Sequence, residues 1–97
     1  MLIGVPKEIK TEEYRVGLSP YNVRELVSRG HRIVVESNAG SAIGFTNQDY
    51  TIAGAVVVDT SDEVYSSGDM IVKVKEPQHS EYSKLRENQI LFTYLHL

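Results

Sequence analysis

Short apolar runs alternate along this chain with segments that carry helix boundary signals, and no other feature limits the fold as strongly. The runs are rich in Val and Ile and cover residues 2–5, 33–35, 55–58, 70–74 and 90–92. Strands that alternate with helices need crossover connections, and these produce a parallel sheet with helices on its faces. The pattern therefore predicts an α/β fold built on a doubly wound, mostly parallel sheet.

The segments between the runs predict helices of different strength. The clearest begins at Ser19, an N-cap residue that is followed by Pro20 at the first helical position. Its apolar stripe starts at Val23, and Gly30 is placed to end it. Helices between parallel strands give three layers, so we expect an arrangement of the Rossmann-like or flavodoxin-like type.

Three shorter helices are expected further along the chain. Asn47 is predicted to cap one that ends at Gly54, and Thr60 or Ser61 opens the next. Ser80 begins a fourth, weaker helix.

Two stretches and the chain end complete the predicted organisation. Residues 37–44 are mostly small and predict a loop with room for a single helical turn, whereas the continuous run 55–58 is typical of a strand covered on both faces. A doubly wound domain normally continues into a helix after its last strand. We therefore expect the domain to be truncated after the fifth strand, at Leu97.

Composition excludes several classes of function. The chain has 97 residues, enough for one domain, with ten basic and thirteen acidic residues and a net charge of −3. That balance offers no attraction for nucleic acid or an anionic membrane. Without cysteine there are no disulfides, no thiolate catalysis and no Cys-bound zinc. No apolar run resembles a signal peptide or a membrane span, so we expect a cytoplasmic location.

Three cationic or titratable side chains follow predicted strands. Arg15 lies in the long segment after the first strand, Lys75 follows the fourth and His96 follows the fifth. Open parallel sheets bind ligands outside the carboxyl ends of their strands, so these residues are candidates for one site. An arginine fork, a lysine charge and an imidazole together suit a small 2-oxo or 2-amino acid.

Each candidate also has a structural interpretation that the pattern leaves open. Arg15 belongs to a charged segment, where most side chains are simply solvated. Lys73 and Lys75 would share one face of a strand, so that one of them extends along a sheet edge into solvent. His96 lies between leucines, as interior histidines often do.

The chain lacks the motifs of the common cofactor and metal sites. Its seven glycines form neither a G-x-G-x-x-G fingerprint nor a P-loop. No spacing of histidines suggests a metal site. We therefore expect no cofactor-binding and no metal-binding residue in this chain.

Four blocks of the chain resemble a known family. Ile-Gly-Val-Pro-Lys-Glu-Ile-Lys at residues 3–10 and Glu-Tyr-Arg-Val-Gly-Leu-Ser-Pro at residues 13–20 are similar to the opening of the alanine dehydrogenases and of the related transhydrogenase alpha subunits. Val-Lys-Val-Lys-Glu-Pro at residues 72–77 and Leu-Phe-Thr-Tyr-Leu-His-Leu at residues 91–97 resemble the next two blocks. The likeness covers essentially the whole chain.

The resemblance implies a function. The chain would be the N-terminal part of a substrate-binding domain, with the NAD-binding Rossmann domain lying outside it. The family reaction converts L-alanine, NAD and water to pyruvate, ammonia and NADH. Arg15 and Lys75 would bind the substrate carboxylate and its oxygen, and His96 would be the acid–base residue. Family members are homo-hexamers. The isolated chain is expected to be inactive, because NAD is bound mainly by the other domain.

Three alternatives remain. The transhydrogenase alpha subunits, components of a membrane proton pump, generally lack the Tyr-Leu-His-Leu ending. Saccharopine dehydrogenases are more distant, and their opening block matches less well. The alternative from another class is a non-catalytic binding or assembly module.

Overall fold

Five parallel strands form the sheet of this protein. The structure is a computed structural model that describes residues 1–94. Strands β1 (Leu2–Val5), β2 (Arg32–Glu36), β3 (Val56–Val58), β4 (Met70–Lys73) and β5 (Ile90–Thr93) lie in the order β3-β2-β1-β4-β5. Every strand pair is parallel, which confirms the predicted α/β class. The chain order reverses between β1 and β4, and this is the point at which such sheets bind ligands.

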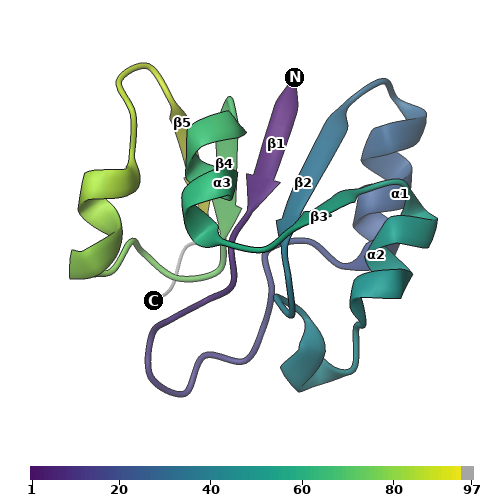
Figure 1. The fold of residues 1–97 in the computed structure, drawn as a ribbon, viewed down its shortest axis with the longest axis horizontal. Helices are drawn as coiled ribbons and strands as arrows, with labels where there is room; N and C mark the ends of the chain where they lie inside the picture. The colour runs from purple at the N-terminus through teal and green to yellow at the C-terminus, as the bar shows by residue number, and fades with distance from the viewer. Residues whose placement is uncertain (95–97) are drawn as a thin grey trace.

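Helices cover both faces of the sheet, as a three-layer fold requires. Helices α1 (Pro20–Ser28) and α2 (Asn47–Ala53) pack against each other on one face, whereas α3 (Ser61–Ser67) packs on the other (Figure 1). The 3₁₀ segment η1 (Ser41–Ile43) is the predicted single turn in the loop after β2. A second 3₁₀ segment, η2 (His79–Lys84), contacts α3.

The helix boundaries follow side-chain capping. Ser19 caps α1 as predicted and accepts a hydrogen bond from the backbone N–H of Asn22. The prediction that Asn47 caps α2 is wrong, because Thr46 has the extended backbone of an N-cap and accepts from the N–H of Asp49. Gly54, in the left-handed conformation, ends α2.

Two further predictions about elements are wrong. The run 55–58 was expected to be covered on both faces, yet β3 lies at the edge of the sheet and Val56 is 61% exposed. A run of valines has high strand propensity whether or not both faces are covered. The predicted fourth helix is the 3₁₀ segment η2, where the side chain of Glu81 turns inward to the sheet.

The two helical layers enclose separate apolar cores. Residues at alternate positions of the strands face opposite sides, so Ile33 and Val35 pack under α1 and α2, whereas Val34 packs under α3. Within residues 1–94, no helix has both the length and the apolar character needed to cross a bilayer.

Candidate functional site

The segment between β1 and α1 runs along the carboxyl edge of the sheet and has no regular secondary structure (Figure 1). Its position depends on specific contacts with neighbouring strands. The N–H of Lys7 donates to Oε1 of Glu36 over 2.8 Å, and Lys10 pairs with Glu76 over 2.6 Å. A Cβ on Gly17 would lie 2.5 Å from the carbonyl oxygen of Val72, so the backbone there passes close to β4. The segment is therefore held against β4 next to the switch point.

Arg15 is bound through its fork to a neighbouring carboxylate. Its Nε donates to Oε2 of Glu13 over 3.0 Å and its Nη2 donates to Oε1 over 2.9 Å. The Arg15 side chain is 60% exposed, whereas that of Glu13 is only 4% exposed. The hydrogen bond from Arg15 lowers the pKa of Glu13 to about 2, against the opposing effect of burial. Reciprocally, the bond to Glu13 raises the pKa of Arg15.

Lys75 reaches the same carboxylate from the other side of the switch point. Its Nζ lies 3.9 Å from Oε1 of Glu13, and its side chain is 13% exposed. Its backbone N–H donates to Oε1 of Glu8 over 3.2 Å. The structure thus brings the two predicted cations, Arg15 and Lys75, to one buried carboxylate. The third predicted residue, His96, lies outside the described residues.

A buried charge network lies directly beneath this site. Lys73 in β4 has a side chain that is 1% exposed, and its Nζ lies 3.1 Å from Oε1 of Glu8 and 3.4 Å from Oε2 of Glu81. Glu8 also accepts from the N–H of Val74, and Tyr65 in α3 donates to Glu81. The pKa of Tyr65 is raised, first by burial and then by the charge of Glu81.

This network corrects one interpretation of the sequence. Lys73 does not extend along a sheet edge, because β4 is an interior strand between β1 and β5. Lys75 lies beyond the end of β4, so the two lysines do not share a strand face.

Two small cavities adjoin Arg15. One of about 290 Å³ is lined by Lys7, Glu8, Glu13, Tyr14, Arg15, Asn38, Ala39 and Ala42. The other, about 250 Å³, is lined by Arg15, Val16, Gly17, Ser19, Asn22, Ile43, Phe45, Val74 and Tyr94. Both are large enough for a three-carbon acid, and Arg15 is the residue that they share.

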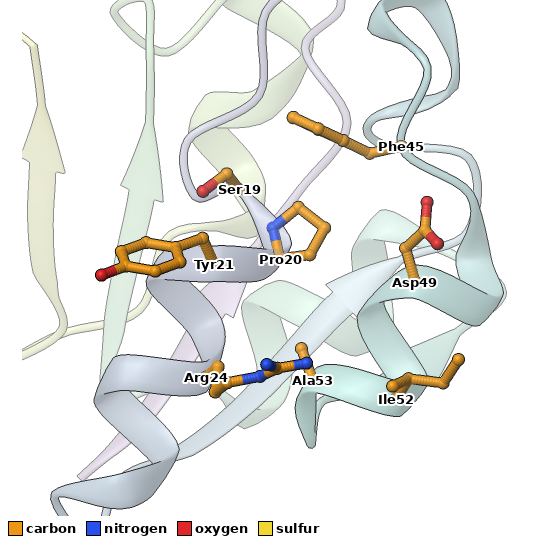
Figure 2. A pocket seen from close by; sticks show the side chains of 8 residues that line it. All are labelled: Ser19, Pro20, Tyr21, Arg24, Phe45, Asp49, Ile52 and Ala53. Carbon is orange, nitrogen blue, oxygen red and sulfur yellow. The ribbon is translucent and has the colours of Figure 1, made fainter.

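A larger hollow of about 440 Å³ lies between α1 and α2 and shares Ser19 and Phe45 with the second of these cavities. Figure 2 shows Arg24 of α1 and Asp49 of α2 beside an otherwise mostly apolar surface formed with Tyr21, Phe45 and Ile52. The carboxylate of Asp49 accepts from the N–H of Thr46 and belongs to the cap of α2. Arg15 does not line this hollow, so we do not place the site there.

Neither a cluster of metal-ligating side chains nor a glycine-rich dinucleotide turn is found among residues 1–94. Residues 1–94 contain no group of three or more carboxylate or imidazole side chains that could hold a metal ion. The β1–α1 connection is long, and at the N-terminus of α1 the side chain of Ser19 accepts from the N–H of Asn22. In a dinucleotide fold, the N–H groups at this end of the helix would face the pyrophosphate.

Sequence reasoning missed the acidic residues of the site. Glu8 and Glu13 lie in the same charged segment as Arg15, yet both are buried. Glu8 pairs with Lys73 at the end of β4, and Glu13 lies 3.9 Å from Lys75 just beyond it. No local signal marks Glu13 as the partner of Arg15, because the inward position of its side chain depends on the left-handed turn at Glu12.

Comparisons with known proteins agree on one family. A family described as alanine dehydrogenase/PNT, N-terminal domain, matches residues 4–97. The chain is 54% identical over 97 residues to an alanine dehydrogenase of Staphylococcus epidermidis and 47% identical to that of Mycolicibacterium smegmatis, covering 100% of this chain and 26% of each relative. The chain thus spans about a quarter of the length of these relatives.

Solved structures give the same result. An L-alanine dehydrogenase structure superposes on 99% of this chain and 26% of its own, with a TM-score of 0.94 and 54% identity. A transhydrogenase from Sinorhizobium meliloti superposes on 98% of this chain and 27% of its own, with a TM-score of 0.90 and 32% identity.

Proposed function

The chain belongs to the family of alanine dehydrogenase/PNT N-terminal domains, and on this premise we propose that it is the substrate-binding part of an NAD-dependent L-alanine dehydrogenase. The reaction is the reversible conversion of L-alanine, NAD and water to pyruvate, ammonia and NADH. The observation that carries the proposal is the meeting of Arg15 and Lys75 at one point of the switch region. With Glu13 ionised, these three groups carry a net charge of +1, which complements a monocarboxylate.

Each residue of the chain has a separate task in this proposal. Arg15 offers the N–H groups that Glu13 does not occupy to the substrate carboxylate. Lys75 offers an ammonium to a carboxylate or carbonyl oxygen of the substrate, and His96 holds or releases a proton at the amine, hemiaminal and carbonyl stages. Fixing the carboxylate orients the α-carbon, which is a large part of what an enzyme supplies to a transfer reaction.

NAD is the proposed cofactor, held mainly by residues outside this chain. The absence of a glycine-rich fingerprint from residues 1–97 supports that division. We assign no step of hydride transfer to a residue of the chain. The family likeness also supports a cytoplasmic homo-hexamer, which size-exclusion chromatography with light scattering on a complete enzyme would test.

The transhydrogenase alpha subunit is the alternative function. The Sinorhizobium meliloti structure supports a shared fold, but its 32% identity is well below the 45–54% of alanine dehydrogenase relatives. The two functions differ in their substrate. A dehydrogenase must bind pyruvate or alanine at this domain, whereas hydride exchange between two nucleotides needs neither.

A pyruvate titration of the ¹⁵N-labelled chain tests the proposal. We expect saturable shifts of the backbone amides of Arg15, Val74 and Lys75, and loss of these shifts in Arg15→Ala. Arg24→Ala is the matched control, since Arg24 lines the larger hollow between α1 and α2. Shifts confined to that hollow, or equal losses in both variants, would contradict the assignment.

A second measurement tests catalytic incompleteness. The 97-residue chain is mixed with NAD and L-alanine, and the absorbance of the reduced cofactor is followed. No increase is expected, and turnover by the chain alone would refute the proposal that other residues must hold NAD.

A further inference from the structure

Glu13 contacts both proposed substrate cations, and nothing in the proposed reaction uses it. Its two oxygens accept from three donors of Arg15, namely the backbone N–H, Nε and Nη2, over 2.9 to 3.0 Å. Oxygen Oε1 also lies 3.9 Å from Nζ of Lys75. A carboxylate that is 4% exposed and takes three hydrogen bonds from one neighbour is held in a single orientation.

The backbone around Glu13 is shaped to turn this side chain inward. The N–H of Glu13 donates to the carbonyl of Lys10 over 3.0 Å, which closes a tight turn. Glu12 within that turn has φ of 64°, in the left-handed region that a residue with a side chain adopts at a cost. The local conformation thus carries strain at Glu12, and the carboxylate of Glu13, the next residue, lies within reach of both cations.

The hydrogen bonds to Glu13 leave one edge of the guanidinium available. Glu13 occupies Nε and one N–H of Nη2. Among residues 1–94, no group accepts from Nη1, so the edge formed by Nη1 and the second N–H of Nη2 can receive a ligand. A guanidinium bonded on one edge is fixed in its plane, and its other edge then has a defined direction.

We propose that Glu13 is a positioning residue that orients the free edge of Arg15 and the ammonium of Lys75 toward one ligand carboxylate without touching the ligand. This inference rests on the proposed function. Two other roles would have the opposite consequence. If Glu13 competes with the substrate for Arg15, or only offsets its charge, neutralising Glu13 should strengthen the binding of an anion. If Glu13 positions the cations, neutralising it should weaken that binding.

The direction in which neutralising Glu13 changes the binding of pyruvate therefore tests the inference. The assay uses a complete enzyme in which residues 1–97 replace the matching segment of the Staphylococcus epidermidis relative. In Glu13→Gln we expect the KM for pyruvate to rise roughly tenfold or more, as for loss of a charge-assisted contact, while the KM for NADH changes less than about twofold. An unchanged or lower KM for pyruvate would overturn the inference.

Glu25→Gln is the matched control. It removes the same charge from an exposed carboxylate on α1 whose side chain has no hydrogen-bond or ion-pair partner within residues 1–94. We expect its KM for pyruvate to stay near that of the parent. An equal rise in both variants would mean a general charge effect, and this too would overturn the positioning role.

Failure of the underlying function gives a different result. If Arg15→Ala leaves the KM for pyruvate unchanged, the proposed site itself is wrong, whatever Glu13→Gln does. If Glu13→Gln does not fold, a measurement on the complete enzyme without the substitution still tests the inference. At saturating pyruvate, the Nε–H of Arg15 should remain protected from exchange with water. Loss of that protection would show that the ligand displaces Glu13, which contradicts a positioning role.

Discussion

Replacing Lys73 with methionine should strongly destabilise the fold. Lys73 is the cation between two buried carboxylates, with Nζ 3.1 Å from Glu8 and 3.4 Å from Glu81, and all three side chains are 1% exposed. Methionine has nearly the same length and volume, so the substitution removes the charge and leaves little empty space. Both carboxylates then stay in the interior without their cation.

The magnitude follows from the cost of a broken buried pair. Removing one partner of such a pair costs about 3–5 kcal/mol, against a total stability of roughly 5–15 kcal/mol for a domain. For a chain of this size the loss corresponds to a fall in Tm on the order of 15–30 °C. Lys84→Met is the matched control, because Lys84 pairs with the exposed Asp62 over 3.3 Å. Its cost should stay below about 1 kcal/mol.

Urea unfolding followed by far-UV circular dichroism measures both variants. The chain has no tryptophan, so circular dichroism is preferable to fluorescence. Glu81→Gln in the Lys73→Met background should recover part of the loss, because it neutralises one of the two stranded carboxylates. A cost for Lys73→Met that equals the cost for Lys84→Met would refute the reasoning, and so would strict additivity of Lys73→Met and Glu81→Gln.

Four further outcomes are expected. His96→Ala in a complete enzyme should abolish alanine oxidation and leave NAD binding nearly intact, as steady-state kinetics and calorimetry would measure. Arg15→Ala should weaken pyruvate binding roughly tenfold to a hundredfold, and an unchanged affinity would exclude a carboxylate clamp. Gly17→Ala should lower the free energy of unfolding by about 1–3 kcal/mol, because its Cβ would meet the carbonyl of Val72 at 2.5 Å. The folded-state pKa of Glu13 is about 2, below its ordinary value. Ionised Glu13 therefore stabilises the fold above about pH 4.5 and loses that effect as the pH falls toward 2. The urea midpoint should drop more over this window in the parent than in Glu13→Gln.

The fold could be predicted from the sequence because strand and helix signals are local. Ser19 and Pro20 specify the start of α1 with their own chemistry, and Gly54 specifies the end of α2. The position of a strand within the sheet is not determined by local sequence signals. The valine run of β3 and the mixed run of β4 both have strand propensity, yet β3 lies at an edge and β4 in the interior. Strand order depends on how the helices pack.

The same limit applies to the site. Arg15 and Lys75 could be selected because cationic residues after strands meet at one edge of a parallel sheet. Glu13, the carboxylate that contacts both, could not be selected from the sequence. Whether its side chain points inward depends on the left-handed turn at Glu12 and on the position of β4. The buried position of Lys73 could not be predicted for a related reason. A lysine in a strand is usually near solvent, and only the tertiary structure supplies the carboxylates of Glu8 and Glu81.

The sheet and the acidic residues make different contributions to the site. Parallel strands bring the segment after β1 and the segment after β4 to the same edge, which places Arg15 and Lys75 in one region of the fold. The position of the backbone does not determine the orientation of a flexible side chain, because long cationic side chains have many rotamers. Glu8 holds the backbone N–H of Lys75, and Glu13 holds the guanidinium of Arg15 by two hydrogen bonds. Because charge-assisted hydrogen bonds are directional, these carboxylates supply the orientation that apolar packing cannot supply to a charged group. A site that must align a small acid for reaction needs both the position that the sheet supplies and the orientation that the carboxylates supply. The orientation of the bound acid should therefore depend as much on Glu8 and Glu13 as on the cations.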